Sequence, residues 1–492
     1  MRNPIASLLL VLALPVAAIA EDFTPRAVVL RAAPLAAVPT ASFGRLDLAG
    51  LAVEDVLREE QDLAPRYAVP HTVRWTPWTS GAWEELPAGV SLWRLRIRAE
   101  GAASINLGFT SFWLPEGARL QIYSADLAHV VRPFTSADNE EHGELWTPAV
   151  PTDDLVVELS TPTSERGRIE LVLGQVGQGY RGFGSLGVTE KSGSCNMDVE
   201  CLNGGDPWRE VARAVGVISV GGSRFCSGSL VNNTAQDRKM YFITAQHCGI
   251  DSGNAASLVV FWNYQNSTCR TPGSAASGSA GNGPLNQFHT GSFFRAESGD
   301  SDFTLVELDD PPVAAFNHYW AGWDHSAGDV ACPDGICYEC SETSLCAGIH
   351  HPNAEEKRVT FVEQSIQPMP GDDTHLWAHW DPDPVFPPNP GLTIPPQVTE
   401  PGSSGSPLYN RNRRFVGQLH GGPSFCGATD DALSDYYGRF STSWSVAAPF
   451  LDPGNTGDLF IDGRDYVGAP SSLIFTDGFE NGNTGMWSHS MP

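Results

Sequence analysis

Lysine is the scarcest charged residue in this 492-residue chain. Only Lys191, Lys239 and Lys357 are lysines, out of 30 basic residues in all. Basic charge is scarce as a whole, because 57 acidic residues give a net charge of −27. Proteins that bind nucleic acid need a basic surface for the phosphates, so the net charge argues against nucleic acid as a partner. Apolar runs of about 18 residues are absent after the first twenty residues, and we therefore expect no membrane span there.

Cysteine is missing from the first 194 residues, whereas ten cysteines lie between Cys195 and Cys426. This asymmetry indicates a domain boundary near residue 192. The 50 glycines and 37 prolines favour loop-rich β structure over helical bundles. A chain of this length can form two or three domains, each with its own core.

The first twenty residues have the features of a signal peptide. Arg2 supplies positive charge, residues 5–20 form an apolar run, and Ala18-Ile19-Ala20 has the form of a cleavage site. The alternative is an uncleaved membrane anchor, but the run is short for one. Export would place the ten cysteines in an oxidising compartment, where disulfides are favoured over metal sites. We therefore expect an extracellular protein.

Three further segments follow the signal peptide. Residues 21–191 predict a β-rich domain, because apolar and polar residues alternate or apolar residues cluster at 91–98, 120–123 and 155–159. By itself this domain could be a propeptide or a carbohydrate-binding module. Residues 192–466 contain the cysteines and many short predicted strands, and residues 467–492 form a tail of unknown role.

Three residues in the cysteine-rich segment predict nucleophilic catalysis. His247 ends an apolar strand, Asp302 begins an alternating strand, and Ser404 lies in a tight glycine/serine turn. A serine hydroxyl becomes a nucleophile when an imidazole takes its proton and a carboxylate orients that imidazole. The backbone amides of Gly402 and Ser404 are the expected oxyanion donors. The order His, Asp, Ser fits chymotrypsin-like enzymes and differs from that of subtilisins and α/β-hydrolases.

The chain also resembles a known family, the lysyl endopeptidases, which are secreted bacterial serine proteases. The resemblance is carried by residues 194–201, 214–216, 244–248, 262–269, 350–353, 402–407 and 417–423. It implies an all-β fold, with a chymotrypsin-like double β-barrel of two six-stranded barrels over 192–466 and the triad in the cleft between them. It makes residues 21–191 a β-rich propeptide. We expect protein and peptide substrates, no cofactor, no metal and a monomer.

The resemblance also implies three disulfides. These are Cys195–Cys426, Cys201–Cys269 and Cys226–Cys248. The remaining cysteines lie in an insertion that departs from the family pattern and comprise Cys332, Cys337, Cys340 and Cys346. Two local disulfides are favoured there over a small zinc site because the protein is exported, while their pairing stays open.

Substrate specificity is predicted from Asp435. Trypsin-like enzymes have an aspartate six positions before the nucleophile, where this chain has Val398. The resemblance instead implies that Asp435 lies in the primary pocket and selects a lysine side chain by charge pairing. His420 would lie beside this pocket, or have a structural role. The scarcity of lysine suits an enzyme that cuts after lysine, although base composition explains it equally well.

Maturation is predicted between Lys191 and Ser192, where the proenzyme would cleave itself. Ser403 precedes the nucleophile, so the aspartate that pairs with a new amino terminus in trypsin-like zymogens is missing. We expect the propeptide to block the cleft or to template folding instead. Two alternatives are a glutamyl-type endopeptidase of the same fold and a catalytically inactive binding protein.

Overall fold

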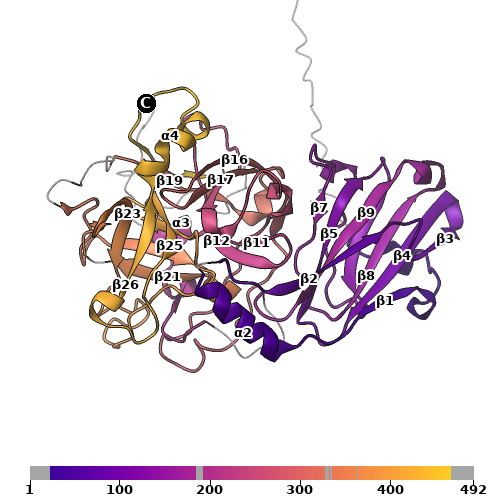
Figure 1. Ribbon diagram of the computed structural model, residues 1–492, viewed down its shortest axis with the longest axis horizontal. Coiled ribbons are helices and arrows are strands. Elements are labelled where there is room, and N and C mark those ends of the chain that lie inside the picture. Colours follow the sequence, from indigo (N-terminus) through magenta and orange to yellow (C-terminus); the bar gives the residue numbers. More distant parts are fainter. Residues whose placement is uncertain are drawn as a thin grey trace, which may run out of the picture.

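The computed structural model describes residues 23–61, 63–183, 192–326, 332, 335–362 and 364–466. The predicted signal peptide, Lys191 and the C-terminal tail therefore lie outside the described residues. Two β-rich parts lie side by side, the first formed by residues 23–183 and the second by residues 192–466 (Figure 1).

The N-terminal part is built from two sheets. One has the order β1-β4-β8-β6 with β3 added to β4, and the other has the order β2-β9-β5-β7. Their bounds are β1 Thr40–Phe43, β2 Ala68–Trp75, β3 Ala82–Leu86, β4 Val90–Ala99, β5 Ser104–Trp113, β6 Arg119–Ser124, β7 Leu145–Trp146, β8 Asp154–Pro162 and β9 Glu170–Gly179. The strands predicted at 91–98, 120–123 and 155–159 are β4, β6 and β8, so the periodicity identified them correctly.

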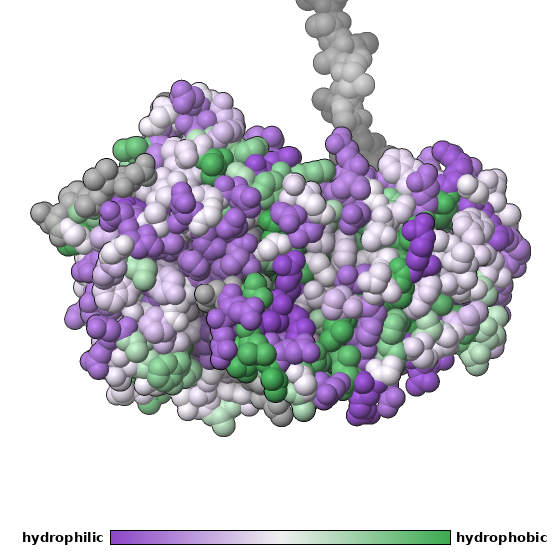
Figure 2. Space-filling model, in the orientation of Figure 1, coloured by the Kyte–Doolittle hydropathy of each residue, from purple (hydrophilic) through white to green (hydrophobic). Residues whose placement is uncertain are grey.

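Two helices in this part had no counterpart in the prediction. They are α1 (Arg26–Val29) and α2 (Leu48–Glu59). The Asp47 side chain caps α2 by accepting a hydrogen bond from the Gly50 amide at 3.1 Å. On the solvent side of α2, Leu48, Val53 and Val56 are exposed, and Figure 2 shows apolar surface there. The helix has an apolar and a charged face, but its apolar side chains lie toward solvent and its buried side chain is that of Asp55.

The C-terminal part contains two curled sheets of seven and ten strands. The seven-stranded sheet has the order β15-β14-β11-β12-β13-β17-β16, and the main path of the second is β10-β21-β20-β24-β25-β26-β23-β22. The first comprises β11 Val215–Val220, β12 Arg224–Leu230, β13 Tyr241–Ala245, β14 Val259–Phe261, β15 Phe288–Thr290, β16 Ser292–Ser298 and β17 Phe303–Leu308. The second comprises β10 Met197–Asp198, β19 Gly322–Asp324, β20 Cys346–His350, β21 Arg358–Val362, β22 Gln367–Met369, β23 Asp372–His379, β24 Pro407–Tyr409, β25 Arg414–Gly421, β26 Ser434–Arg439 and β27 Phe460–Ile461.

These sheets form a chymotrypsin-like β fold, as expected, although their strand numbers differ from two sets of six. Strands β18 (Tyr319–Trp320) and β28 (Arg464–Asp465) form a separate pair, and the helices are α3 (Pro207–Ala212) and α4 (Phe440–Leu451). Within the described part of the chain, no helix is long and apolar enough to cross a membrane.

The two parts share one hydrophobic cluster. Tyr67 and Phe183 from the N-terminal side pack in the same cluster as Phe225 and Phe261, and all four are at most 1% exposed. The Tyr67 hydroxyl lies 2.8 Å from the Ser219 hydroxyl, so a polar contact accompanies the apolar one. The N-terminal part is therefore packed against the first curled sheet by buried aromatic side chains.

Candidate active site

His247 and Asp302 are held together by two hydrogen bonds. Asp302 accepts from the His247 amide at 2.8 Å and lies 2.7 Å from His247 Nδ1 through its other oxygen. Asp302 is 4% exposed and adopts a left-handed backbone with φ of 51°. Its carbonyl accepts from the Gln246 amide at 2.9 Å and from Gln418 Nε2 at 3.2 Å, which fixes this unusual conformation. The carboxylate thereby selects the imidazole tautomer with the proton on Nδ1.

Ser404 lies in a turn whose backbone is fixed from two sides. The Ser404 carbonyl accepts from the Ser227 amide at 2.8 Å, and the Ser227 hydroxyl donates to the Gly402 carbonyl at 2.9 Å. Gly402 has φ of 92°, and an added Cβ would approach Phe225 Cε2 to 2.3 Å, so glycine is required there. Among the described residues, the amides of Gly402 and Ser404 donate to no other protein group. They are available to an oxyanion.

His247 and Ser404 line one cavity of about 240 Å³. Its walls also include His420 from β25, Thr399, Glu400, Gly422 and Ser424 from loops of the C-terminal part, and Glu59, Leu63 and Pro65 from the N-terminal part. The Pro65 carbonyl accepts from the Phe225 amide at 3.0 Å, which holds the segment after α2 against β12. Serine and histidine thus face a cavity between the two sheets, and the N-terminal part contributes to its wall.

Asp435 lies directly behind this cavity. It is 1% exposed, and its carboxylate accepts hydrogen bonds from Trp380 Nε1 at 2.7 Å, Thr399 Oγ1 at 2.8 Å and Ser424 Oγ at 2.6 Å. Gly422 lines the cavity, and an added Cβ on it would lie 2.1 Å from Asp435 Oδ1, so only glycine lets this part of the wall pack directly on the carboxylate. Burial raises the pKa of Asp435 to about 6, against the opposing effect of these donors. A cation in the cavity would relieve that cost of burial.

His420 lines the cavity, as predicted, and belongs to a chain of polar side chains that was not predicted. Its ring stacks on the His247 ring with centroids 5.6 Å apart, and its Nδ1 lies 2.8 Å from His375 Nε2. His375 Nδ1 in turn lies 2.8 Å from Asp372 Oδ2. One side-chain atom from each of His247, Asp302 and His420 lies within 4.8 Å of the other two, so these three side chains could hold a metal ion. His247 is also near Cys226 and Cys248, but those sulfurs form a disulfide.

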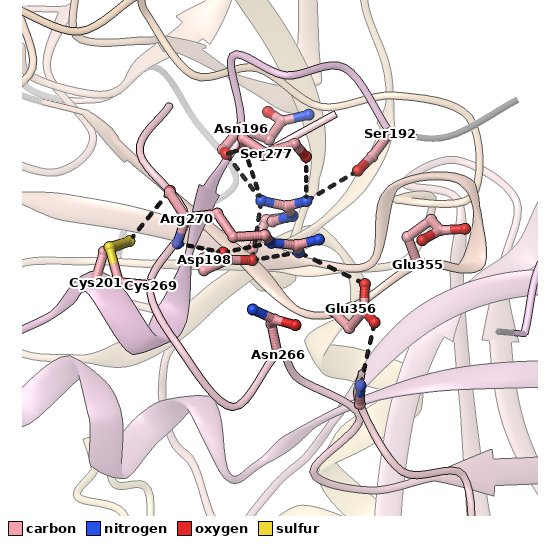
Figure 3. Close-up of polar contacts among 12 residues, drawn as sticks. Ser192, Asn196, Asp198, Cys201, Asn266, Cys269, Arg270, Ser277, Glu355 and Glu356 are labelled. Carbon is pink, nitrogen blue, oxygen red and sulfur yellow. Dashed lines mark hydrogen bonds and ion pairs between the residues drawn. A yellow bond between two sulfur atoms is a disulfide. The ribbon is translucent and has the colours of Figure 1, made fainter. Parts of the chain in front are cut away.

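Ser192, the first residue after the predicted cleavage bond, is buried beneath the cavity wall. Its hydroxyl lies 3.2 Å from Arg358 Nη2, and Arg358 pairs with Asp198 at 2.9 Å (Figure 3). The next residue, Gly193, donates its amide to both oxygens of Glu400 at 2.9 Å. Burial raises the pKa of Glu400, against the effect of this amide. Glu400 was not predicted, because nothing in its local sequence distinguishes it from a surface glutamate.

All ten cysteines are paired in the structure. Cys195–Cys426, Cys201–Cys269 and Cys226–Cys248 are the pairs that the resemblance implies. The insertion forms Cys332–Cys337 and Cys340–Cys346, which are two local disulfides rather than a zinc site. The bond at Cys248 anchors the residue next to His247 to β12.

The structure describes two lysines, Lys239 and Lys357, and the folded protein holds each of them in place. Lys357 is fully buried with its Nζ donating to the Ala212 carbonyl at 2.6 Å, and burial lowers its pKa to about 7. Lys239 is exposed, but its carbonyl accepts a hydrogen bond from Trp320 Nε1 at 3.0 Å. Its peptide bond is therefore tied to the folded core.

Comparisons with known proteins agree on one family. The family model of the lysyl endopeptidase C-terminal domain matches residues 189–438, and that of the lysyl endopeptidase N-terminal domain matches residues 57–171. Lysyl endopeptidase from Pseudomonas aeruginosa is 29% identical over 402 residues, which are 76% of this chain and 78% of that protein.

Solved structures are more distant. The serine endoprotease from Yersinia pestis covers 50% of this chain and 65% of its own, with 14% identity and a TM-score of 0.29. A thermostable serine protease from an extremophilic microorganism covers 50% of this chain and 99% of its own, with 11% identity and a TM-score of 0.31.

Proposed function

Because this chain belongs to the lysyl endopeptidase family and is a serine endopeptidase, we propose that it cleaves peptide bonds on the carboxyl side of lysine. The observation that carries this proposal is the buried carboxylate of Asp435 behind the cavity that His247 and Ser404 line. A lysine ammonium that reaches this carboxylate would be paired in a low-dielectric site. An acidic side chain would be repelled by Asp435 and Glu400, which argues against the glutamyl-type alternative.

In the proposed mechanism Ser404 attacks the scissile carbonyl and His247 takes its proton. Asp302 holds His247 with its unprotonated Nε2 available and stabilises the imidazolium as it forms. The Gly402 and Ser404 amides donate to the developing oxyanion, and one such donor is worth about 3 kcal/mol of barrier. The intermediate collapses as the scissile C–N bond breaks, and His247 gives its proton to the leaving amine, so that an acyl-enzyme on Ser404 remains. Water then attacks the acyl carbonyl with His247 as the base, which releases the new carboxyl terminus and returns the proton to Ser404. Besides water, each of these steps is assigned to a group of this chain.

We further propose that residues 21–191 are a propeptide and residues 192–466 the protease domain. Cleavage after Lys191 would separate them. The contribution of Glu59, Leu63 and Pro65 to the cavity wall supports a propeptide that blocks the cleft. The five disulfides are consistent with an extracellular location.

Digestion of a protein of known sequence tests the specificity. Mass analysis of the new termini should find cuts after lysine, and Ser404→Ala should abolish them. Frequent cuts after arginine or glutamate would refute lysine specificity. For processing, Lys191→Ala should leave the proenzyme uncut, whereas maturation at the same bond and rate would exclude self-cleavage there.

A further inference from the structure

We propose that the active site binds one zinc ion between His247 and His420, and that this ion inhibits the enzyme reversibly. The ion is an inhibitor and not a cofactor, because it would occupy the nitrogen with which His247 takes the proton of Ser404. The inference rests on the proposed role of His247 as the base. It is carried by the way in which the two histidines are held.

His247 is held with its second ring nitrogen unprotonated. Its Nδ1 lies 2.7 Å from Asp302 Oδ2, and an ionised carboxylate only accepts hydrogen bonds, so the proton of the neutral ring is on Nδ1. Nε2 therefore carries a lone pair, which is the state in which an imidazole binds a metal. Histidines that bind metals usually donate their other N–H to a carboxylate or a carbonyl. Asp302 is thus already placed as the supporting carboxylate of a metal ligand.

His420 is held in the same way through one additional residue. His375 Nδ1 lies 2.8 Å from Asp372 Oδ2, which places the proton of neutral His375 on Nδ1. Nε2 of His375 can then only accept, and it lies 2.8 Å from His420 Nδ1, so neutral His420 carries its proton on Nδ1. His375 is 6% exposed, which shields these bonds from water. One carboxylate thereby sets two successive tautomers and makes Nε2 the unprotonated nitrogen of His420.

The two histidines lie close enough to share an ion. Their ring centroids are 5.6 Å apart, and both side chains line the cavity of about 240 Å³. One side-chain atom of His247 lies within 4.8 Å of one of His420. Two ligands of a zinc ion, each about 2.0–2.1 Å from it, are up to about 4 Å apart, so a small rotation of the rings is sufficient. Water would complete the four-coordinate shell, as it does at open zinc sites.

The surroundings favour a dication. Glu400 lines the same cavity, and Asp435 lies behind it with its carboxylate bonded to the cavity residue Thr399. Among the described residues that line the cavity, none is a lysine or an arginine. Imidazole ligands select zinc and similar transition metals, whereas magnesium and calcium prefer oxygen ligands. The site therefore suits zinc better than either of these hard cations.

Zinc on His247 would stop the reaction at its first step. The Nε2 lone pair would be bound to the metal, so His247 could not take the proton of Ser404. Removal of the ion by a chelator would restore both the lone pair and the activity, because no covalent bond of the protein has changed.

Inhibition is measured with the secreted protein, a peptide substrate that contains lysine, and zinc chloride. Activity should fall with a single inhibition constant, return after addition of EDTA, and stay unchanged with magnesium or calcium at the same concentrations. Each variant is compared with its own activity without zinc. His420→Gln should weaken inhibition by about tenfold or more, because one ligand is lost. Equal inhibition of parent and variant, or equal potency of magnesium, would overturn the inference.

His379→Gln is the matched control. It removes a histidine from β23, the strand that carries His375, but His379 does not line the cavity. This variant should be inhibited as the parent is. A loss of inhibition equal to that of His420→Gln would place the zinc elsewhere and overturn the inference.

Binding is measured separately in full-length Ser404→Ala protein, which requires no activity. Cobalt(II) serves as the probe, because its visible absorption reports nitrogen ligands and coordination number. One cobalt ion per chain should give a four-coordinate spectrum that zinc abolishes, and adding His420→Gln should remove this spectrum. An unchanged spectrum after His420→Gln would overturn the inference, even if that variant is inactive.

The outcomes separate this inference from the proposed function. If the protein without zinc does not cut after lysine, the proposed function fails, and the cobalt spectrum still tests the site. If cuts follow lysine but zinc neither inhibits nor binds, only the inference fails.

Discussion

Replacement of Asp435 by asparagine should remove most of the preference for a cationic side chain. The carboxylate is 1% exposed, accepts three side-chain hydrogen bonds and lies behind the cavity of Ser404. Loss of one partner of a buried ion pair costs about 3–5 kcal/mol, because the remaining charge is left unpaired. At 1.36 kcal/mol per factor of ten, this corresponds to a factor of roughly 150 to 5,000.

The assay compares two synthetic substrates that differ only in the ammonium group. Norleucine has the hydrocarbon chain of lysine without its charge, so the ratio of the two kcat/KM values reports the charge pairing alone. Any ionisation that affects the chemical step alone acts on both substrates and cancels in this ratio. The ratio should fall by the stated factor in Asp435→Asn. It should stay unchanged in Asp324→Asn, whose carboxylate is also buried in the second sheet but bonds to Asn410 and Ser326.

The ratio should also depend on pH in a defined direction. Because burial raises the pKa of Asp435 to about 6, the carboxyl of the free enzyme loses its charge as the pH falls through 6. The lysine-to-norleucine ratio should therefore be flat above about pH 7 and decline below pH 6, and kcat/KM reports this free-enzyme titration. A ratio that is flat from pH 5 to 8, or that survives Asp435→Asn within tenfold, would refute the assignment.

Other consequences of the structure can be measured on the same protein. Asp302→Asn should lower kcat by roughly 10⁴ at neutral pH through loss of the required imidazole tautomer, with KM little changed in steady-state assays. In a Ser404→Ala background, the raised pKa of Asp435 means that its ionisation costs the folded state stability as pH rises from about 4 to 6. Asp435→Asn should therefore raise the free energy of unfolding in urea, relative to its parent, by about 3 kcal/mol more at pH 8 than at pH 4. An equal difference between variant and parent at both pH values would contradict this. Joint replacement of Cys226 and Cys248 by serine should lower the free energy of unfolding by about 2–5 kcal/mol, whereas an unchanged unfolding midpoint would argue against a constraint next to His247.

The fold class and the positions of the candidate triad were predictable because each has a local signal. The strand at β4 alternates in polarity, and the turn around Ser404 is dense in glycine and serine. His247, Asp302 and Ser404 each belong to a short motif, so their proximity could be expected once the chain order was recognised.

The features that were missed depend on contacts between distant segments. Glu400 bonds the Gly193 amide across 207 residues, and His375 meets His420 across 45 residues. Neither residue stands out in its own neighbourhood. Packing against the rest of the protein determines these contacts, and no periodicity encodes it. Helix α2 is different, because Asp47 caps it and charged residues such as Glu54 and Arg58 give it a polar face, so the prediction overlooked a local signal.

The burial of Ser192 and the Gly193–Glu400 hydrogen bond have a practical consequence for anyone who produces this protein. An added Cβ on Gly193 would lie 2.2 Å from Cys426 Sγ and 2.6 Å from Glu400 Oε1, so position 193 has no room for a side chain. Any substitution there would push against the Cys195–Cys426 disulfide and against Glu400, which lines the cavity of Ser404. Labels and engineered residues should therefore avoid position 193.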